Sequence, residues 1–138
     1  MSNFQNDSFT KQKVNGIELN VRNQGRGEPS LLFLHYWGGS SRTWNLVIDR
    51  LETDFRCVAY DQRGWGDSAK PEKGYSIQDL ANDAEALIQT LGLTRYVLIG
   101  HSMGGKVAQL LASKRPEGPQ SIDLSRASAS ESNEPDRS

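Results

Sequence analysis

The stretch from Tyr96 to Gly105 constrains the fold of this chain more than any other. Four apolar residues run directly into Gly100-His101-Ser102-Met103-Gly104, and a helical pattern of apolar residues follows at once. A strand that reverses into a helix within one or two residues must hold the residue at the turn in a strained backbone conformation. Side chains at positions 100 and 104 would collide where strand and helix cross, so glycine is needed at both. We therefore expect a sharp turn that exposes the Ser102 hydroxyl at the end of a buried strand.

The N-terminal part of the chain predicts a β-hairpin. Residues 9–14 and 17–23 are separated by Asn15-Gly16, a strong signal for a two-residue hairpin turn. In the second segment, apolar residues stand at every other position, as expected of a strand with one buried face.

Strand-like and helix-like segments alternate after the hairpin. Apolar runs at 31–34, 55–60 and 96–99 are typical of buried strands, and helical spacing of apolar residues follows each of them. The first of these helices is expected to bury a face made of Trp44, Val47, Ile48 and Leu51.

The sequence predicts where the second helix begins and ends. Ser76-Ile77-Gln78-Asp79 resembles a capping box, and Gly92 is a natural stop. A hairpin followed by strand–helix units predicts an α/β protein. We expect a mostly parallel sheet with an antiparallel N-terminal hairpin and helices on both faces.

Charge and cysteine usage exclude several classes of partner. The net charge of −1 gives no electrostatic reason to expect nucleic acid or an anionic membrane surface. A single cysteine, Cys57, excludes an intramolecular disulfide framework and a cysteine-based zinc site, and its apolar surroundings predict a buried, inert thiol. The first residues lack the basic start and apolar core of a signal peptide, and no apolar run is long enough to span a bilayer. We therefore expect a cytoplasmic protein.

The character of the sequence changes after residue 117. Residues 118–138 are rich in serine and acidic residues and nearly free of large apolar side chains. Such a segment buries too little apolar surface to offset the entropy lost on ordering. We expect a folded domain over 9–117 and a disordered polar tail over 118–138.

Three motifs in order resemble those of the α/β-hydrolase family. They are His35-x-x-Gly38-Gly39, Asp61-x-Arg63-Gly64-x-Gly66-x-Ser68 and Gly100-x-Ser102-x-Gly104-Gly105. Each motif alone is a weak signal, but the three lie between strand–helix units, and together they look like the branch of small serine esterases, non-haem peroxidase-like enzymes and carbon–carbon bond hydrolases. The resemblance covers residues 9–117, so the sheet implied is the N-terminal half of that fold, an incomplete one.

The resemblance implies a role for each motif residue. Ser102 would be the nucleophile, with the Met103 backbone N–H as one oxyanion-hole donor. The second donor would be the Trp37 N–H, with Tyr36 as the alternative. His35 would brace the loop that carries this donor, and Gly100 and Gly104 would be structural. The resemblance implies a small-molecule, ester-like substrate and no metal or organic cofactor.

Several other residues are open to more than one interpretation. Asp61 and Arg63 are more often a structural loop pair than catalytic groups, and His101 is expected to pack against a neighbouring strand. Trp37, Trp44 and Trp65 could line the mouth of a pocket or serve in packing. A serine at position 102 argues against the haloalkane dehalogenase and epoxide hydrolase branches, which place aspartate there.

The sequence lacks one catalytic residue that the family requires, a histidine after the serine. The family orders its triad as Ser, then Asp or Glu, then His, but both histidines of this sequence, His35 and His101, precede Ser102. Without a general base, a serine hydroxyl is a poor nucleophile. We expect an inactive N-terminal half of a serine hydrolase, produced by truncation or by a change of reading frame near Gly118. The alternatives are a half-enzyme completed by a second chain and a non-catalytic interaction module.

The elbow strand, 96–99, is expected to form one edge of the sheet, because the strands that follow it in the family are missing. An apolar edge without proline or charge recruits other chains. The sequence therefore predicts self-association through this edge and poor solubility.

Overall fold

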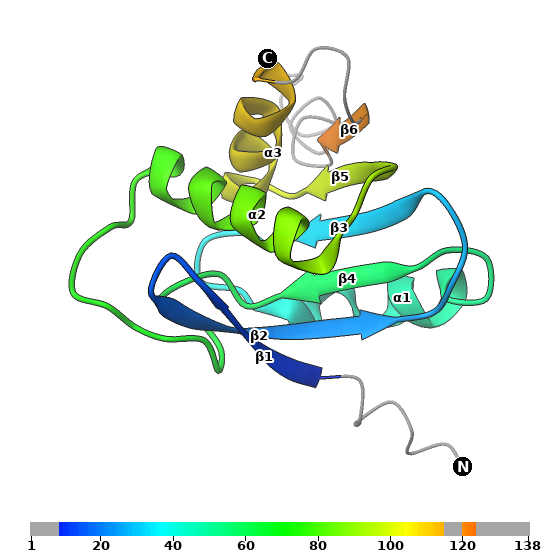
Figure 1. The fold of residues 1–138 in the computed structure, drawn as a ribbon, viewed down its shortest axis with the longest axis horizontal. Coiled ribbons are helices and arrows are strands. Elements are labelled where there is room, and N and C mark those ends of the chain that lie inside the picture. The colour runs from blue at the N-terminus through cyan, green and yellow to red at the C-terminus, as the bar shows by residue number, and fades with distance from the viewer. Residues whose placement is uncertain (1–8, 115–119, 124–138) are drawn as a thin grey trace, which may run out of the picture.

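One mixed sheet organises the part of the chain that the computed structural model describes, residues 9–114 and 120–123 (Figure 1). Its strands are β1 (Phe9–Val14), β2 (Ile17–Gln24), β3 (Ser30–Leu34), β4 (Cys57–Tyr60), β5 (Tyr96–Gly100) and β6 (Gln120–Asp123). The helices are η2 (Ser41–Trp44), α1 (Asn45–Leu51), α2 (Ile77–Leu91) and α3 (Met103–Ser113). The strand order is β1-β2-β4-β3-β5-β6. Strands β3, β4, β5 and β6 run parallel, whereas β2 is antiparallel to both β1 and β4, which confirms the predicted fold class.

The hairpin forms as its turn residues predict. Val14 pairs with Ile17, and the two residues between them, Asn15 and Gly16, have φ values of 48° and 81°. Both lie in the left-handed region that asparagine and glycine tolerate best.

Successive side chains of the central strands point to opposite faces of the sheet and pack into two separate hydrophobic cores. Leu32 and Leu34 of β3 point into the larger core, which α2 and α3 cover. Leu31 and Phe33 point into the smaller core, where they meet Trp44 of η2 and Ile48 of α1. Figure 1 shows α2 in front of the sheet and α1 behind it, so helices cover both faces as predicted.

One part of the predicted buried helical face is wrong. Val47 is 39% exposed and its neighbour Leu46 is 77% exposed, whereas Trp44 and Ile48 are buried. The reason is that residues 41–44 form a 3₁₀ turn before the α-helix begins. This tighter winding changes which residues face the sheet, and Val47 falls outside the contact.

Helix α2 begins and ends where the sequence predicts. The Asp79 N–H donates to Ser76 Oγ at 3.0 Å, and the Ser76 N–H donates to Asp79 Oδ2 at 3.1 Å, which completes the capping box. Gly92 ends the helix with φ 67° in the left-handed region.

Arg63 and Asp83 join three segments that are distant in sequence. Arg63 donates from Nε to Asp83 Oδ2 at 2.6 Å and from Nη2 to Oδ1 at 2.9 Å. The same carboxylate, on α2, accepts a hydrogen bond from Asn15 Nδ2 at the hairpin turn. One buried carboxylate therefore ties the hairpin and the loop after β4 to α2.

The prediction that the elbow strand forms the sheet edge is wrong. β6 pairs with β5 in parallel, with Val97 opposite Gln120 and Gly100 opposite Asp123. Strand β5, helix α3 and strand β6 form a crossover unit, and pairing with β5 places residues 120–123 in the sheet although they are largely polar. The remainder of the predicted polar tail, 118–119 and 124–138, lies outside the described residues. Self-association stays a prediction, and the last strand on that side among the described residues is β6.

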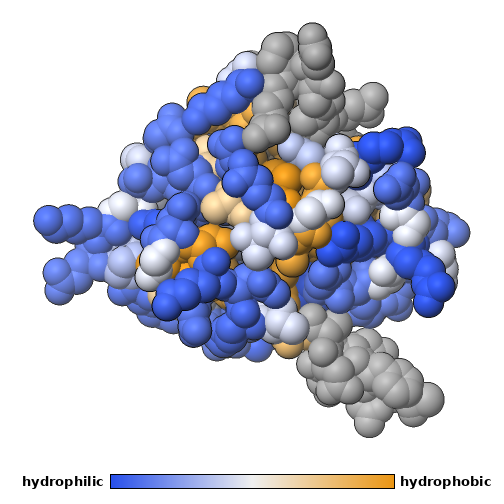
Figure 2. Space-filling model, in the orientation of Figure 1, coloured by the Kyte–Doolittle hydropathy of each residue, from blue (hydrophilic) through white to orange (hydrophobic). Residues whose placement is uncertain are grey.

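Polar and apolar residues share the face of the molecule shown in Figure 2. Hydrophilic side chains cover much of the face shown in Figure 2, with apolar surface visible between them. Among the helices of the described ranges, none has both the length and the apolar character needed to cross a bilayer. Cys57 is buried as predicted, and burial raises the pKa of its thiol to about 11.

Replacement of Asp83 by alanine should destabilise the fold strongly. The Arg63 side chain, 12% exposed, would lose its carboxylate partner and keep a poorly solvated charge. Breaking a buried ion pair from one side costs about 3–5 kcal/mol, which urea unfolding would measure. As a control, Glu28→Ala removes a carboxylate that is 58% exposed and pairs at 3.1 Å with Arg95, which is 69% exposed, and it should cost under about 1 kcal/mol. Equal losses in the two variants would contradict a structural role for Asp83.

Candidate active site

Ser102 stands at the turn between β5 and α3 in a strained conformation. Its φ is 58° and its ψ is −118°, a combination that few non-glycine residues adopt. The residue is exposed, and its side chain makes no capping hydrogen bond to α3. The hydroxyl is thus presented at the carboxyl end of the parallel strands, where ligands of open α/β sheets bind.

Gly100 and Gly104 leave no room for a side chain. A Cβ atom on Gly100 would lie 2.3 Å from the Gly104 carbonyl oxygen. A Cβ atom on Gly104 would lie 2.2 Å from the Leu34 carbonyl oxygen and 2.6 Å from that of His35. The turn therefore brings α3 into backbone contact with the end of β3.

The first turn of α3 begins directly at Ser102. The Gly105 N–H donates to the Ser102 carbonyl oxygen at 2.8 Å, and the Gly104 N–H donates to that of His101 at 3.0 Å. Met103 is the first helical residue, and an N–H group at this position has no partner within the helix. Together with the partial positive charge of the helix end, this favours a negative oxygen beside Ser102.

A tight turn after β3 lies beside the elbow. Leu34 and Gly100 are opposite one another in the sheet, so the residues that follow them diverge from the same edge. The Gly39 N–H donates to the Tyr36 carbonyl oxygen at 2.9 Å, and Gly38 has φ 84°, as a turn of this kind requires. The same carbonyl oxygen lies 2.8 Å from His35 Nδ1. Because a trans peptide points its N–H opposite to its C=O, the Trp37 N–H is directed away from the His35 ring.

His35 is fully buried, and both of its ring nitrogens are engaged. Nε2 accepts a hydrogen bond from the Gln62 N–H at 2.9 Å, so Nδ1 carries the proton and donates to the Tyr36 carbonyl oxygen. Gln62 Nε2 donates in return to the His35 carbonyl oxygen at 3.0 Å. Burial lowers the pKa of His35, outweighing the opposing effects of its bond to Tyr36 and of the Asp61 charge. Neutral His35 therefore connects the turn after β3 to the loop after β4.

Asp61 and Arg63 are both structural, but each binds a different partner. Burial disfavours the charge of Asp61, yet the N–H groups of Asp67 and Ser41, with further hydrogen bonds, hold its pKa below the ordinary value. Arg63 binds Asp83, as described above. Asp61 thus joins the loop after β4 to η2, and Arg63 joins the same loop to α2.

The three tryptophans separate into two roles. Trp44 is buried in the smaller core, with its ring centroid 5.0 Å from that of Phe33. Trp37 and Trp65 meet edge to face beside the elbow, at 4.5 Å between ring centroids. His101 lies edge to face with Tyr36 at 5.5 Å.

Gln62 was not singled out from the sequence. Its contact with His35 joins two loops that are far apart along the chain, and no local pattern marks it. Within residues 9–114 and 120–123, no group of three or more His, Cys, Asp or Glu side chains gathers in a way that could hold a metal ion.

Comparisons with known proteins agree with the architecture. Residues 29–135 match the sequence model of a family described as the alpha/beta hydrolase fold. The chain is 39% identical over 118 residues to 2-(acetamidomethylene)succinate hydrolase of Mesorhizobium japonicum. The aligned region covers 84% of this chain and 42% of that protein. It is 39% identical over 95 residues to a soluble epoxide hydrolase of Corynebacterium sp., covering 69% of this chain and 33% of that protein.

A solved structure also matches this chain over part of its own length. The crystal structure of epoxide hydrolase VrEH1 from Vigna radiata superposes with a TM-score of 0.76 at 34% identity, over 85% of this chain and 38% of that one. The chain thus spans less than half the length of the relatives it matches.

Gly104→Ala should unfold the elbow. The new methyl group would overlap the Leu34 carbonyl oxygen, a backbone atom that cannot rotate away. We expect a loss of about 3 kcal/mol or more in the free energy of unfolding, at the upper end of overpacking effects. Gly16→Ala is the control, since no atom lies within 4 Å of the position that its Cβ would take and only its φ of 81° opposes the change, at about 1–2 kcal/mol. A Gly104→Ala loss no larger than that of the control would contradict the close approach.

The stability of the fold should fall on mild acidification. Unfolded His35 binds a proton near its ordinary pKa of 6.5, whereas the folded residue binds it only at lower pH. Stability is therefore complete above about pH 6.5 and declines below it toward the folded pKa, by at most about 1.4 kcal/mol per pH unit. Urea unfolding between pH 5 and 7.5 measures the slope. His35→Gln should reduce the dependence of the unfolding free energy on pH, whereas the control His101→Gln, which keeps His35, should not. An unchanged slope in His35→Gln would refute the assignment of this pH dependence to His35.

Proposed function

The chain belongs to the α/β-hydrolase family, and from this premise we propose that it is part of a serine hydrolase in which Ser102 attacks a carbonyl carbon. The observation that carries the proposal is the backbone of Ser102, a non-glycine residue at φ 58°. Strain of this kind persists only where the surrounding structure enforces it, and here Gly100 and Gly104 allow the contacts that do so. The exposed hydroxyl is the group that the strain positions.

Two backbone N–H groups are proposed to stabilise the oxyanion that forms when the hydroxyl attacks. One is that of Met103, at the start of α3. The other is that of Trp37, which is favoured over Tyr36 because the Tyr36 carbonyl oxygen is fixed by His35 and Gly39 and thereby orients the Trp37 N–H. Each such donor contributes roughly 3–4 kcal/mol to transition-state stabilisation.

The serine favours acyl substrates over epoxides, although relatives of this chain are named epoxide hydrolases. A serine oxygen that attacks a carbonyl forms an acyl ester, which water can hydrolyse to regenerate the enzyme. A serine oxygen that opened an epoxide would form an ether, which water does not cleave under mild conditions. We therefore propose hydrolysis of a small ester or of a related acyl or carbon–carbon bond next to a carbonyl.

The general base is proposed to come from outside this sequence. His35 cannot accept the Ser102 proton, because both its ring nitrogens are bonded within a buried site. His101 is the other histidine of the sequence and precedes the nucleophile. The family's acid and histidine follow the serine, so we propose that this chain does not hydrolyse a substrate by itself.

Two other proposals differ in what restores or replaces activity. A half-enzyme completed by a second chain would gain activity only on mixing. A non-catalytic interaction module would bind a partner equally well after Ser102→Ala. We rank the module below the inactive serine hydrolase half, because the elbow glycines and the loop after β3 are features of catalytic sites in this family.

Activity should appear when the missing part of the site is supplied. The full chain alone should release p-nitrophenolate from p-nitrophenyl acetate no faster than its Ser102→Ala variant. Residues 1–117 fused to the corresponding C-terminal part of 2-(acetamidomethylene)succinate hydrolase should hydrolyse the same ester, because that part brings the acid and histidine that the family places there. Initial rates with excess substrate measure both.

The matched control is Ser113→Ala, which removes an exposed hydroxyl at the far end of α3 and should leave the fusion active. Ser102→Ala should lower its rate by at least about 10³-fold. An active fusion that tolerates Ser102→Ala would refute the nucleophile, and Ser102-dependent turnover by the chain alone would refute its inactivity.

A further inference from the structure

Four aromatic residues from two separate loops gather beside the elbow. We call Tyr36, Trp37, Trp65 and Tyr75 the aromatic cluster. Trp65 lies at its centre, edge to face with Trp37 at 4.5 Å and with Tyr75 at 6.3 Å between ring centroids. On its other side it meets the ring of His35 at 5.8 Å.

The cluster lies next to the nucleophile. Tyr36 follows Leu34 by two residues, as Ser102 follows Gly100, and Leu34 and Gly100 are opposite one another in adjacent parallel strands. The Tyr36 ring lies against that of His101, the residue before Ser102. The cluster and Ser102 therefore lie at the same edge of the sheet.

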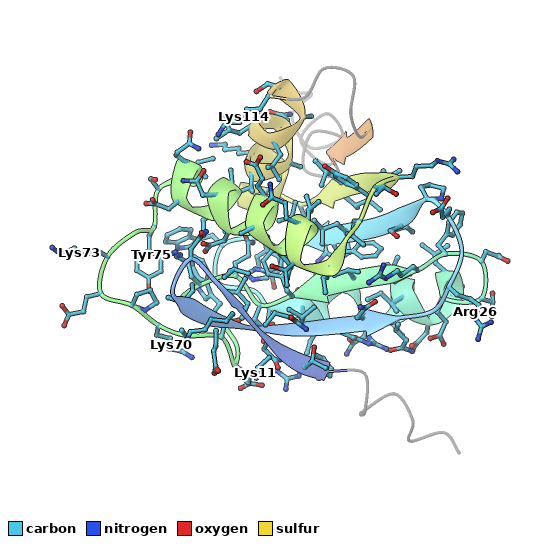
Figure 3. The ribbon with its side chains drawn as sticks, in the orientation of Figure 1. Lys11, Arg26, Lys70, Lys73, Tyr75 and Lys114 are labelled. Carbon is cyan, nitrogen blue, oxygen red and sulfur yellow. The ribbon has the colours of Figure 1, made fainter. Side chains whose placement is uncertain are left out.

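Two glycines lie directly against rings of the aromatic cluster. A Cβ atom on Gly64, which has φ 92°, would lie 2.5 Å from the Tyr75 ring. A Cβ atom on Gly39 would lie 3.1 Å from the Tyr36 ring. Figure 3 shows the Tyr75 side chain turned inward from its loop, whereas Lys73 nearby points outward. Two glycines thus make room for two of the four rings, which indicates a preorganised surface.

Part of this surface is open to solvent. Trp37 is 58% exposed and Tyr36 is 39% exposed, whereas Trp65 beneath Trp37 is only partly exposed. Among the described residues, the other large apolar side chains with comparable exposure are Leu46 and Val47, on α1. Exposed aromatic rings backed by further rings bind flat apolar groups by stacking or edge contacts.

We propose that the aromatic cluster is a subsite for a flat aromatic group of the substrate, with Trp37 as the residue that selects it. The proposal rests on the proposed function, since the subsite is defined by its position beside Ser102. It narrows the substrate class to acyl compounds, such as aryl esters, that carry an aromatic ring close to the reacting carbonyl.

Binding can be tested without catalysis in the full chain carrying Ser102→Ala. Phenyl acetate and cyclohexyl acetate are neutral esters of similar size, and only the first has a flat ring. In an NMR titration we expect phenyl acetate to shift the indole N–H signals of Trp37 and Trp65 and to leave that of the buried Trp44 unmoved. Its Kd should be roughly two- to tenfold lower than that of cyclohexyl acetate, the range expected for an aromatic pair.

Variants separate ring recognition from general apolar binding. Trp37→Leu should abolish the preference for phenyl acetate, and Trp37→Phe should retain part of it. Leu46→Ala, which removes an exposed apolar side chain on the opposite face, should leave the preference unchanged. Equal Kd values for the two esters, or a preference that survives Trp37→Leu, would overturn the subsite. Because no turnover is measured, that result is independent of whether Ser102 is the nucleophile.

Discussion

The close approach of α3 to the end of β3 is the constraint on which the rest of the structure depends. Gly104 lies against the carbonyl oxygens of Leu34 and His35, and no side chain fits between them. This contact fixes the angle at which the helix leaves β5, and so the strained backbone of Ser102. It also places the start of α3 beside the turn at Tyr36 and Trp37. One backbone contact thus brings the Ser102 hydroxyl, the N-terminus of α3 and the turn after β3 to the same edge of the sheet.

A second layer of contacts holds the loops around that place. His35 and Gln62 exchange two hydrogen bonds between the turn after β3 and the loop after β4. Asp61 accepts hydrogen bonds from the N–H groups of Asp67, in its own loop, and of Ser41, in η2, and Arg63 binds Asp83 on α2. These contacts hold the turn after β3 and the loop after β4 in fixed positions around the elbow.

Local signals in the sequence predicted local structure well. Asn15-Gly16 specified the hairpin, and Ser76 with Asp79 specified the start of α2, because neighbouring residues decide both. The strand at Gln120–Asp123 was missed, since its place in the sheet comes from pairing with β5 rather than from its own apolar pattern. The contacts of His35 with Gln62 and of Arg63 with Asp83 join distant segments, so no spacing could reveal them. Motif resemblance singled out Ser102 as a candidate, and the structure shows the contacts around it; its role as the nucleophile stays a prediction.

The position of β3 has a consequence for how this chain is made. Leu31 pairs with Cys57 on one side and with Val97 on the other, so β3 is synthesised long before either neighbour. Its five residues are buried on both faces in the finished sheet and have no local partner in the nascent chain. Loops of this length close slowly, and an unpaired apolar strand is open to wrong partners meanwhile. The centre of the sheet can become complete only when the residues of β5 have left the ribosome, so β3 is open to wrong partners from its own synthesis until then.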